Sequence, residues 1–186
     1  MAKLTYVTSM SLDGFIEDAR GAFAWLPLDE EVFARHTEIV RSAGGLVYGR
    51  RLYDAMAVWE TDPALAAQSA PFAAFARAWS APAKTVYSRT LADAPTARTV
   101  IEPRFDPAAL RRLKDAADAD LLIGGADIAA QAFAAGLIDE CRLFIQPVSV
   151  GGGKPGLPVG ARLDLQLAQQ ERFPGGVVEL RYRVRS

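Results

Sequence analysis

The chain has 186 residues, 51% of them hydrophobic, and a formal net charge of −1. This length favours one domain, residues 1–186, whose core needs no disulfide or metal, and the charge balance excludes binding to nucleic acid or membranes through a basic excess. The single cysteine excludes an internal disulfide and a multi-cysteine metal site, so we expect no metal, and it fits a cytoplasmic location.

The first half of the chain is predicted to alternate strands with helices. Residues 3–9 are expected to form a strand, because the N-terminus lacks the apolar run of a signal peptide. Nowhere does the chain approach the roughly 20 consecutive apolar residues of a membrane span. An apolar stripe predicts a helix over 29–42. Further strands are expected at 46–48, 85–87 and 99–101, and further helices at 50–56 and 71–79.

The second half continues this alternation. Asp106 as N-cap and Pro107 at the first helical position predict a helix over 107–117. A buried strand at 121–123 then leads into a helix over 126–135, which ends at Gly136. The next strand alternates, which places Cys141 in the core as an inert thiol.

The C-terminal segment is predicted to form an antiparallel hairpin. Its strands are expected at 162–166 and 178–184, separated by a turn at 174–176. Alternation gives the second strand one apolar face and one charged face, and we expect the charged face to be solvated. The apolar residues are Val178, Leu180, Tyr182 and Val184, and the charged ones are Glu179, Arg181, Arg183 and Arg185. The fold class is therefore α/β, with a mostly parallel central sheet, flanking helices and antiparallel C-terminal strands.

Three predicted strands end in segments suited to a phosphate-bearing ligand: VYGRRLYD (47–54), VYSRT (86–90) and IGGADIA (123–129). Ligands bind at the carboxyl ends of strands in open α/β sheets. Glycines let the backbone approach a ligand, helix N-termini offer free N–H groups, and arginines offer forked donors. Each segment alone has an ordinary alternative: a helix start with solvated arginines, a surface turn, and a tight strand–helix turn. Neither GxGxxG nor GxxxxGK[ST] is present.

Other segments have both an ordinary and a functional interpretation. The Asp13-Gly14 pair, in residues 9–21, predicts either a hairpin turn or a loop that closes over a ligand, with Gly14 and Gly21 giving it freedom. The only histidine, His36, is expected to be a satisfied, partly buried side chain. The core interpretation is favoured for Trp25 and Trp59 over walls for a planar substrate. Residues 151–153 are three glycines, which predict a flexible turn or bulge.

With these motifs placed, the chain resembles the dihydrofolate-reductase-like superfamily. More narrowly, it is similar to stand-alone proteins that match the C-terminal reductase domain of the riboflavin-biosynthesis deaminase–reductase. The matching pieces are SLDGFI, LVYGRRLYD, KTVYSRT and LIGGADIAAQAFAAGLIDECRLFIQPVSVGGG, which follow the family's order over nearly the whole chain. The last piece is the most specific of them. The resemblance does not fix a substrate.

The resemblance implies an NADPH site, and three segments of this sequence match the segments that form it in the family. The first segment, matching the part that holds cofactor phosphates, is Gly49, Arg50 and Arg51. The second, matching the turn at the adenosine end, is Ser88, Arg89 and Thr90. The third, matching the glycine corner under the pyrophosphate and nicotinamide, is Gly124, Gly125, Ala126, Asp127 and Ile128. The Gly-Gly peptide bond of the family is often cis.

Two carboxylates are candidates for the substrate side. The resemblance places Asp29 where dihydrofolate reductases carry the acid that contacts the pterin, and Asp13 is shared with riboflavin-pathway reductases. Either could orient or protonate the substrate, although an N-cap role for Asp29 and a turn role for Asp13 are the ordinary alternatives. One departure matters: Phe15 follows Gly14, where riboflavin-pathway reductases usually carry a basic residue suited to a phosphorylated substrate.

The sequence therefore predicts an NADPH-dependent oxidoreductase that transfers hydride to a small planar heterocycle, pteridine- or pyrimidine-like. The alternative is a non-catalytic nucleotide-binding module that keeps the cofactor corner but lacks a substrate pocket. The partners are expected to be a small-molecule substrate and, by the resemblance, a second copy in a homodimer.

Overall fold

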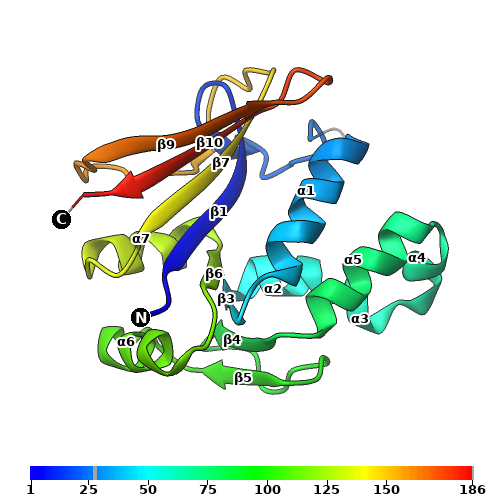
Figure 1. The fold of residues 1–186 in the computed structure, drawn as a ribbon, viewed down its shortest axis with the longest axis vertical. Helices are drawn as coiled ribbons and strands as arrows, with labels where there is room; N and C mark the ends of the chain where they lie inside the picture. Colours follow the sequence, from blue (N-terminus) through cyan, green and yellow to red (C-terminus); the bar gives the residue numbers. More distant parts are fainter. Residues whose placement is uncertain (27–28, 186) are drawn as a thin grey trace.

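The computed structural model describes residues 1–26 and 29–185. Its main element is an eight-stranded sheet in the order β5-β4-β3-β6-β1-β7-β10-β9 (Figure 1). Neighbours from β5 to β7 pair in parallel, whereas β10 pairs antiparallel with both β7 and β9. The strands of this sheet are β1 (Leu4–Ser11), β3 (Gly45–Gly49), β4 (Ala83–Tyr87), β5 (Thr99–Glu102), β6 (Leu121–Gly124), β7 (Glu140–Gln146), β9 (Leu165–Arg172) and β10 (Val178–Val184).

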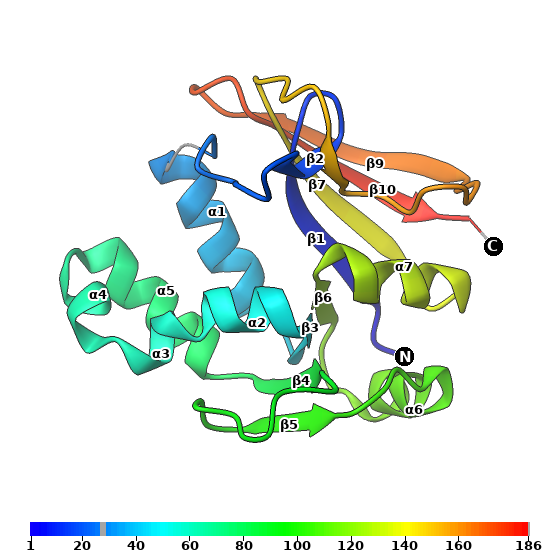
Figure 2. The same ribbon diagram turned by 180° about the vertical axis from the view of Figure 1, so that it is seen from behind.

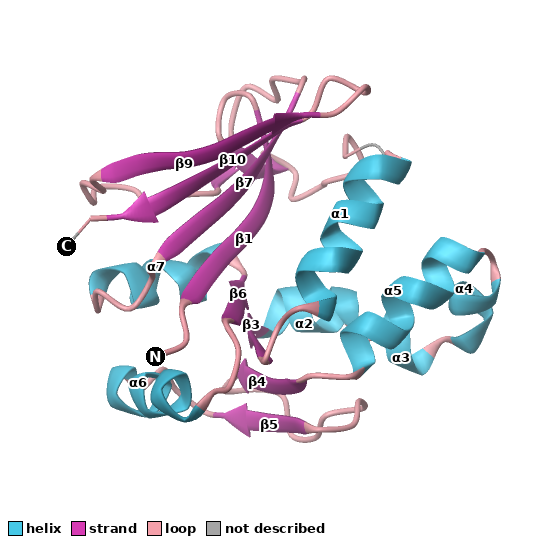
Figure 3. Cartoon of the chain, viewed as in Figure 1, coloured by secondary structure: helices cyan, strands magenta, loops and turns pink. Residues whose placement is uncertain are grey.

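Helices lie on both faces of this sheet (Figures 2 and 3). On one face, residues of α1 pack with Phe144 of β7, and residues of α5 pack with β3 and β4. On the other face, residues of α6 and α7 pack with β1 and with Cys141 of β7. The helices are α1 (Glu30–Arg41), α2 (Arg50–Met56), α3 (Val58–Thr61), α4 (Pro63–Ala67), α5 (Ala70–Ser80), α6 (Pro107–Ala116) and α7 (Ala126–Ala134). None of the described helices has the length and apolar character needed to cross a membrane.

The predicted fold class is confirmed, and most predicted elements exist within a residue or two of the expected bounds. One strand was placed wrongly: it was predicted at 162–166, but β9 spans Leu165–Arg172. The alternation of Leu163 and Leu165 suggested a strand there, yet Leu163 packs on the core from a loop. Most of β9 is polar and exposed because it is an edge strand, where no core contact imposes alternation.

Four short elements were not predicted: α3, α4, β2 (Phe15–Asp18) and β8 (Gly153–Pro155). The start of α4 follows ordinary capping rules, since the Asp62 side chain accepts hydrogen bonds from the Ala64 and Leu65 amides. Strands β2 and β8 pair antiparallel in a separate two-stranded sheet, which we call the ribbon. The ribbon comes from the two segments that were expected to be loops.

Strand β1 lies in the middle of the sheet although it comes first in the chain. It pairs with β6 on one side, where Leu4 faces Leu121, and with β7 on the other, where Thr5 faces Glu140. Asp139 fixes its start, because the Asp139 carboxylate accepts from the Leu4 amide at 2.6 Å and from Lys114 Nζ at 2.6 Å. β1 is therefore a buried central strand between β6 and β7.

The prediction of a solvated charged face on β10 was wrong for Glu179 and partly wrong for Arg181. Glu179 is 3% exposed, and it faces Arg35 Nε of α1 at 2.8 Å and Arg142 Nε of β7 at 2.8 Å. Arg181 is half-buried against Glu140. Burial opposes ionisation of Glu140, but bonds from Lys3 and Arg181 outweigh it and lower its pKa.

Candidate functional site

The three segments predicted to bind a ligand come together at one edge of the sheet. β3 lies between β4 and β6, with Gly49 opposite Tyr87 and Tyr48 opposite Gly124. Because these strands are parallel, their carboxyl ends lie side by side, and the starts of α2 and α7 follow directly. The structure therefore gathers residues 49–51, 88–90 and 124–128 around this edge, which we call the corner.

Two glycines bring the backbones of the corner into close approach. Gly125 has φ +98°, and a Cβ built on it would lie 3.6 Å from the Gly49 nitrogen. A Cβ on Gly124 would lie 2.5 Å from Leu52 Cδ2, so the Leu52 side chain would have to shift to admit one. The positive φ of Gly125 and its approach to the Gly49 backbone therefore favour glycine at this position. No cis peptide bond occurs among the described residues, so the cis Gly-Gly bond suggested by the resemblance is not found.

The start of α7 lacks a side-chain cap. Gly125 is its N-cap residue, and no side chain accepts a hydrogen bond from the first turn. Gly49 holds the corresponding position at α2, also without a side-chain cap. The first N–H groups of a helix have no intrahelical partner and suit an anion. The corner thus combines free backbone donors with close backbone approach.

The three predicted arginines differ in whether an ion-pair partner lies close to the guanidinium group. Arg50 Nη1 lies 3.0 Å from Asp54 Oδ2 within α2. Arg51 Nη1 lies 3.7 Å from Glu17 Oε2 of the ribbon, and Arg89 is exposed. All three side chains are accessible to a ligand. Ser88 Oγ accepts from the Thr90 and Leu91 amides, so the Ser88 side chain shapes the turn that presents Arg89.

The ribbon contributes two charged residues that sequence reasoning missed. Glu17 and Lys154 are register partners in the ribbon. Glu17 pairs with Arg51 after β3, and Lys154 Nζ lies 2.6 Å from Asp127 Oδ2 in the first turn of α7. A row of alternating charges therefore links the starts of α2 and α7 across the ribbon. The sequence feature that accompanies the ribbon is Gly153. In the structure a Cβ at this position would collide with the backbone of Glu17 and Asp18, so the close pairing of β2 and β8 requires glycine there.

Asp13 fastens the loop after β1 to the segment after β7. Its carboxylate accepts from Ser149 Oγ at 2.8 Å and from the amides of Gly151 at 2.7 Å and Val150 at 3.1 Å. A hydrogen bond from Ser11 and these further bonds hold the pKa of Asp13 well below its usual range. The carboxylate is ionised at neutral pH, so it is not suited to donate a proton. Its geometry supports a role in fixing the loop.

Asp29 caps α1, as the ordinary interpretation proposed. Its Oδ1 accepts from the Glu31 and Val32 amides, each at 3.0 Å. Its other oxygen, Oδ2, is packed so close to Gly175 in the β9–β10 turn that a Cβ there would overlap it. The N-cap role is confirmed, and the catalytic role stays a prediction. Neither Asp29 nor Asp13 belongs to the three strand ends that form the corner.

The aromatic and sulfur side chains behave mainly as core residues. The His36 ring lies 4.1 Å from that of Phe144, and burial lowers its pKa to about 4. Cys141 is fully buried, as expected, and burial raises its pKa to about 12. Trp59 packs with phenylalanines of α1 and α5. Trp25 is half-buried, with its indole N–H donating to the Ala22 carbonyl.

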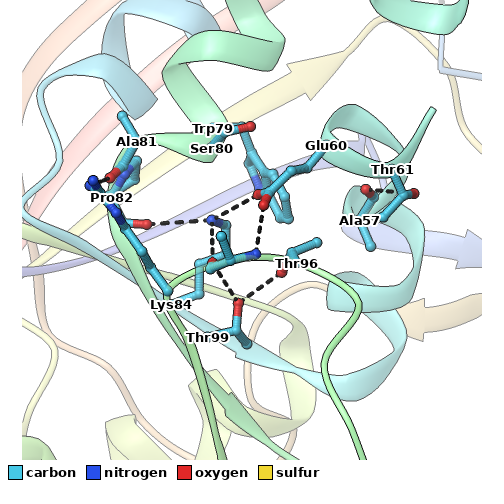
Figure 4. Close-up of polar contacts among 12 residues, drawn as sticks. Ala57, Glu60, Thr61, Trp79, Ser80, Ala81, Pro82, Lys84, Thr96 and Thr99 are labelled. Carbon is cyan, nitrogen blue, oxygen red and sulfur yellow. Dashed lines mark hydrogen bonds and ion pairs between the residues drawn. The ribbon is translucent and has the colours of Figure 1, made fainter. Parts of the chain in front are cut away.

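A second polar cluster lies near the start of β4, away from the corner (Figure 4). Lys84 is 1% exposed; its Nζ lies 3.3 Å from Glu60 Oε2 and 4.5 Å from the centre of the Trp79 ring. Burial lowers the pKa of Lys84, and the charge of Glu60 opposes this shift. Glu60 also accepts from the Ala97 amide at 2.6 Å. These contacts tie α3 and α5 to the sheet and give the cluster a structural role.

The fold is α/β, and the corner lies at the carboxyl ends of three parallel strands. The model of the RibD C-terminal domain family matches residues 2–178. The chain therefore belongs to the RibD C-terminal domain family, as the resemblance predicted. The described residues hold no group of three or more His, Cys, Asp or Glu side chains suited to a metal ion.

Known proteins are similar to this chain in sequence or in fold. Uncharacterized protein YyaP of Bacillus subtilis (strain 168) is 27% identical over 181 residues, which is 94% of this chain and 90% of that protein. A protein from Shewanella sp. PV-4 named for riboflavin biosynthesis has a similar structure, with a TM-score of 0.74, 20% identity and full coverage of both chains. A pyrimidine reductase-like protein from Corynebacterium diphtheriae has a TM-score of 0.70 and 12% identity, with 100% of this chain and 92% of that one covered. These structural likenesses support the fold.

Proposed function

We propose that this protein is an NADPH-dependent oxidoreductase that transfers hydride to a small planar heterocycle, pteridine- or pyrimidine-like. The observation that carries the proposal is the corner, where the parallel pairing of β4, β3 and β6 brings three strand ends together. Family membership supports a reductase, since this domain is the reductase part of the deaminase–reductase. The lone, buried Cys141 also fits a cytoplasmic location.

The residues of the corner fit a dinucleotide. A side chain at Gly125 would approach the Gly49 backbone nitrogen, and the uncapped start of α7 suits a pyrophosphate. Arg51 and Arg89 offer guanidinium groups for phosphate, including a 2′-phosphate. NADPH, when bound, supplies the hydride. The protein's part is to hold both partners in contact and to exclude water.

The substrate side depends on the carboxylates. Asp13 fixes the loop after β1 rather than donating a proton. Asp29 remains the candidate for orienting or protonating the substrate, because Oδ2 makes no hydrogen bond among the described residues while Oδ1 caps α1. Asp29→Asn separates the two roles, since asparagine also caps helices. We expect Asp29→Asn to keep thermal stability but to lower kcat at least tenfold. Unchanged turnover would remove Asp29 from the reaction.

Cofactor titration tests the core of the proposal. NADPH fluorescence is followed as protein is added, with NADH as the comparison ligand. We expect saturable NADPH binding at micromolar cofactor and weaker NADH binding, because the arginines favour the additional phosphate. A chain that binds neither at high micromolar cofactor is not a nicotinamide-dependent enzyme.

The alternative function is a non-catalytic nucleotide-binding module. The ordinary N-cap role of Asp29 and the tight loop role of Asp13 favour it, because each carboxylate already has structural partners. A protein that binds NADPH but oxidises none of it with a panel of pteridines and pyrimidines would support this alternative.

Homodimer formation also stays a prediction. The apolar residues of β10 are only half-buried, which is compatible with a contact to another chain. Light scattering on a size-exclusion column checks it: a homodimer has twice the 20.0 kDa mass of the chain.

A further inference from the structure

Lys154, the middle residue of β8, has a mostly buried side chain whose charged end lies at the start of α7. Only 23% of the side chain is exposed, and its Nζ lies 2.6 Å from Oδ2 of Asp127 in the first turn of that helix. The stem is therefore covered while the ammonium group is held in one place. An ion pair with an acid that is 81% exposed contributes little to stability. Stability alone thus does not explain why this lysine is held there.

The ribbon directs Lys154 toward the corner. Lys154 and Glu17 are register partners in this antiparallel pair, so their side chains project from the same face of the ribbon. Glu17 reaches Arg51 in the first turn of α2, and Lys154 reaches Asp127 in the first turn of α7. This face of the ribbon therefore lies toward the two helix starts that follow β3 and β6.

The charge of α7 explains what a cation does at this place. Asp127 is the only charged residue of α7, and it lies in the first turn, beside the N-terminus that no side chain caps. The free N–H groups there attract a phosphate, but the Asp127 carboxylate repels it. Lys154 neutralises that carboxylate while the two are paired, and a lysine ammonium binds phosphate oxygens as a point charge. The pair therefore turns an unfavourable local charge into a favourable one.

We propose that Lys154 is a cofactor-binding residue whose Nζ contacts the pyrophosphate of NADPH beside the start of α7. The inference rests on the proposed function and deepens it, because it adds the ribbon to the three strand ends that hold the cofactor. The pyrophosphate is common to NADPH and NADH, whereas the 2′-phosphate, for which Arg89 is a candidate ligand, occurs in NADPH alone. Lys154 therefore affects the affinity for both cofactors and not the preference between them.

Lys154→Met tests the contact, because it keeps an unbranched stem and removes the charge. The affinities for NADPH and NADH are measured by fluorescence titration of the wild-type protein and the variant. We expect Lys154→Met to weaken the binding of both cofactors about tenfold, so that the ratio of the two affinities stays the same. Lys154→Arg keeps the charge and should retain most of the affinity. Arg89→Ala should instead weaken NADPH binding alone and lower the ratio.

Lys3→Met is the matched control. Lys3 Nζ also pairs with a carboxylate, Glu140 Oε1, at 2.7 Å, but it lies next to the amino end of β1. Because β1 runs parallel to β6, this is the end of the sheet opposite the corner. We expect Lys3→Met to leave both cofactor affinities unchanged. Thermal unfolding without cofactor checks that each variant is folded at the temperature of the titration.

Asp127→Asn should have the opposite effect. It frees Lys154 and removes the repelling carboxylate, so we expect the affinity for both cofactors to rise about two- to threefold. If Lys154→Met binds both cofactors as the wild type does, or loses affinity for NADPH alone, then Lys154 does not contact the pyrophosphate and the inference is wrong. If the wild-type protein binds neither cofactor, the proposed function itself fails, so the two failures are distinguishable.

Discussion

The corner and the C-terminal hairpin differ in where their charged side chains lie: they are accessible at the corner, whereas Glu179 of the hairpin is buried and paired. At the corner, Arg51 and Arg89 remain accessible, and the closest contacts are made by glycine backbones. In the hairpin, Glu179 is buried between Arg35 and Arg142, while the apolar residues of β10 stay half-exposed. Accessible charge can bind a ligand, whereas buried, paired charge holds elements together. The comparison separates residues that should affect binding from those that should affect stability.

The largest effect on stability is expected from Glu179→Gln. Removing one partner of a buried ion pair leaves the other charge uncompensated, which lowers the free energy of unfolding by about 3–5 kcal/mol. Glu38→Gln is the matched control, because Glu38 also pairs with Arg35 but its side chain is 62% exposed. We expect Glu38→Gln to lower the free energy of unfolding by less than about 1 kcal/mol. Urea unfolding measures both, and equal losses would contradict the distinction between the two pairs.

Gly125→Ala should affect both stability and binding. A non-glycine residue at φ +98° carries strain of about 1–3 kcal/mol, and the new methyl group would crowd the donors of the corner. We expect NADPH affinity to fall at least tenfold, measured by fluorescence titration. Gly136→Ala has a comparable φ of +63° and open space around its Cβ, so it controls for strain alone. The corner would lose its assigned role if both variants bound NADPH equally well.

His36 should give the hairpin side of the molecule a pH-dependent stability. Its folded pKa of about 4 lies below the ordinary value of 6.5. The unfolded state therefore binds the proton first, and stability is present above pH 6.5 and lost as pH falls toward 4. In His36→Gln we expect the free energy of unfolding to fall by about 1–2 kcal/mol less over this pH range than in the wild type. The difference is kept small because the His36 side chain is not completely buried. Thermal unfolding at pH 7 and pH 4.5 gives the difference, and parallel pH curves would show that His36 is not responsible.

The smallest effects are expected at the Arg51–Glu17 pair. Arg51→Ala should weaken NADPH binding about tenfold, which corresponds to about 1.4 kcal/mol. Glu17→Gln should strengthen it two- to threefold, because it frees Arg51 for the cofactor. Both changes should shrink at high salt, since the Arg51 side chain is largely exposed. Opposite signs for the two variants are the result to look for in parallel titrations.

The sequence was sufficient where local rules decide the structure. Capping residues such as Asp106 and glycines such as Gly136 marked helix ends, and the Gly124-Gly125 pair after an apolar run marked one strand end of the corner. It was insufficient where partners come from far along the chain. The burial of Glu179 depends on Arg35 of α1, and Lys154 reaches Asp127 only because β8 pairs with β2. Alternation within β10 alone could not show which face would be covered.

The central place of β1 also determines the order in which the chain can acquire structure during synthesis. β1 leaves the ribosome before its register partners at Leu121 and Glu140. Its apolar residues, including Leu4 and Tyr6, must stay unpaired until β6 and β7 have been made. Such long-range pairing slows folding and prolongs the exposure of apolar surface. Chain lengths that stop before β7 should therefore be poorly folded and depend on chaperones, whatever the stability of the finished protein.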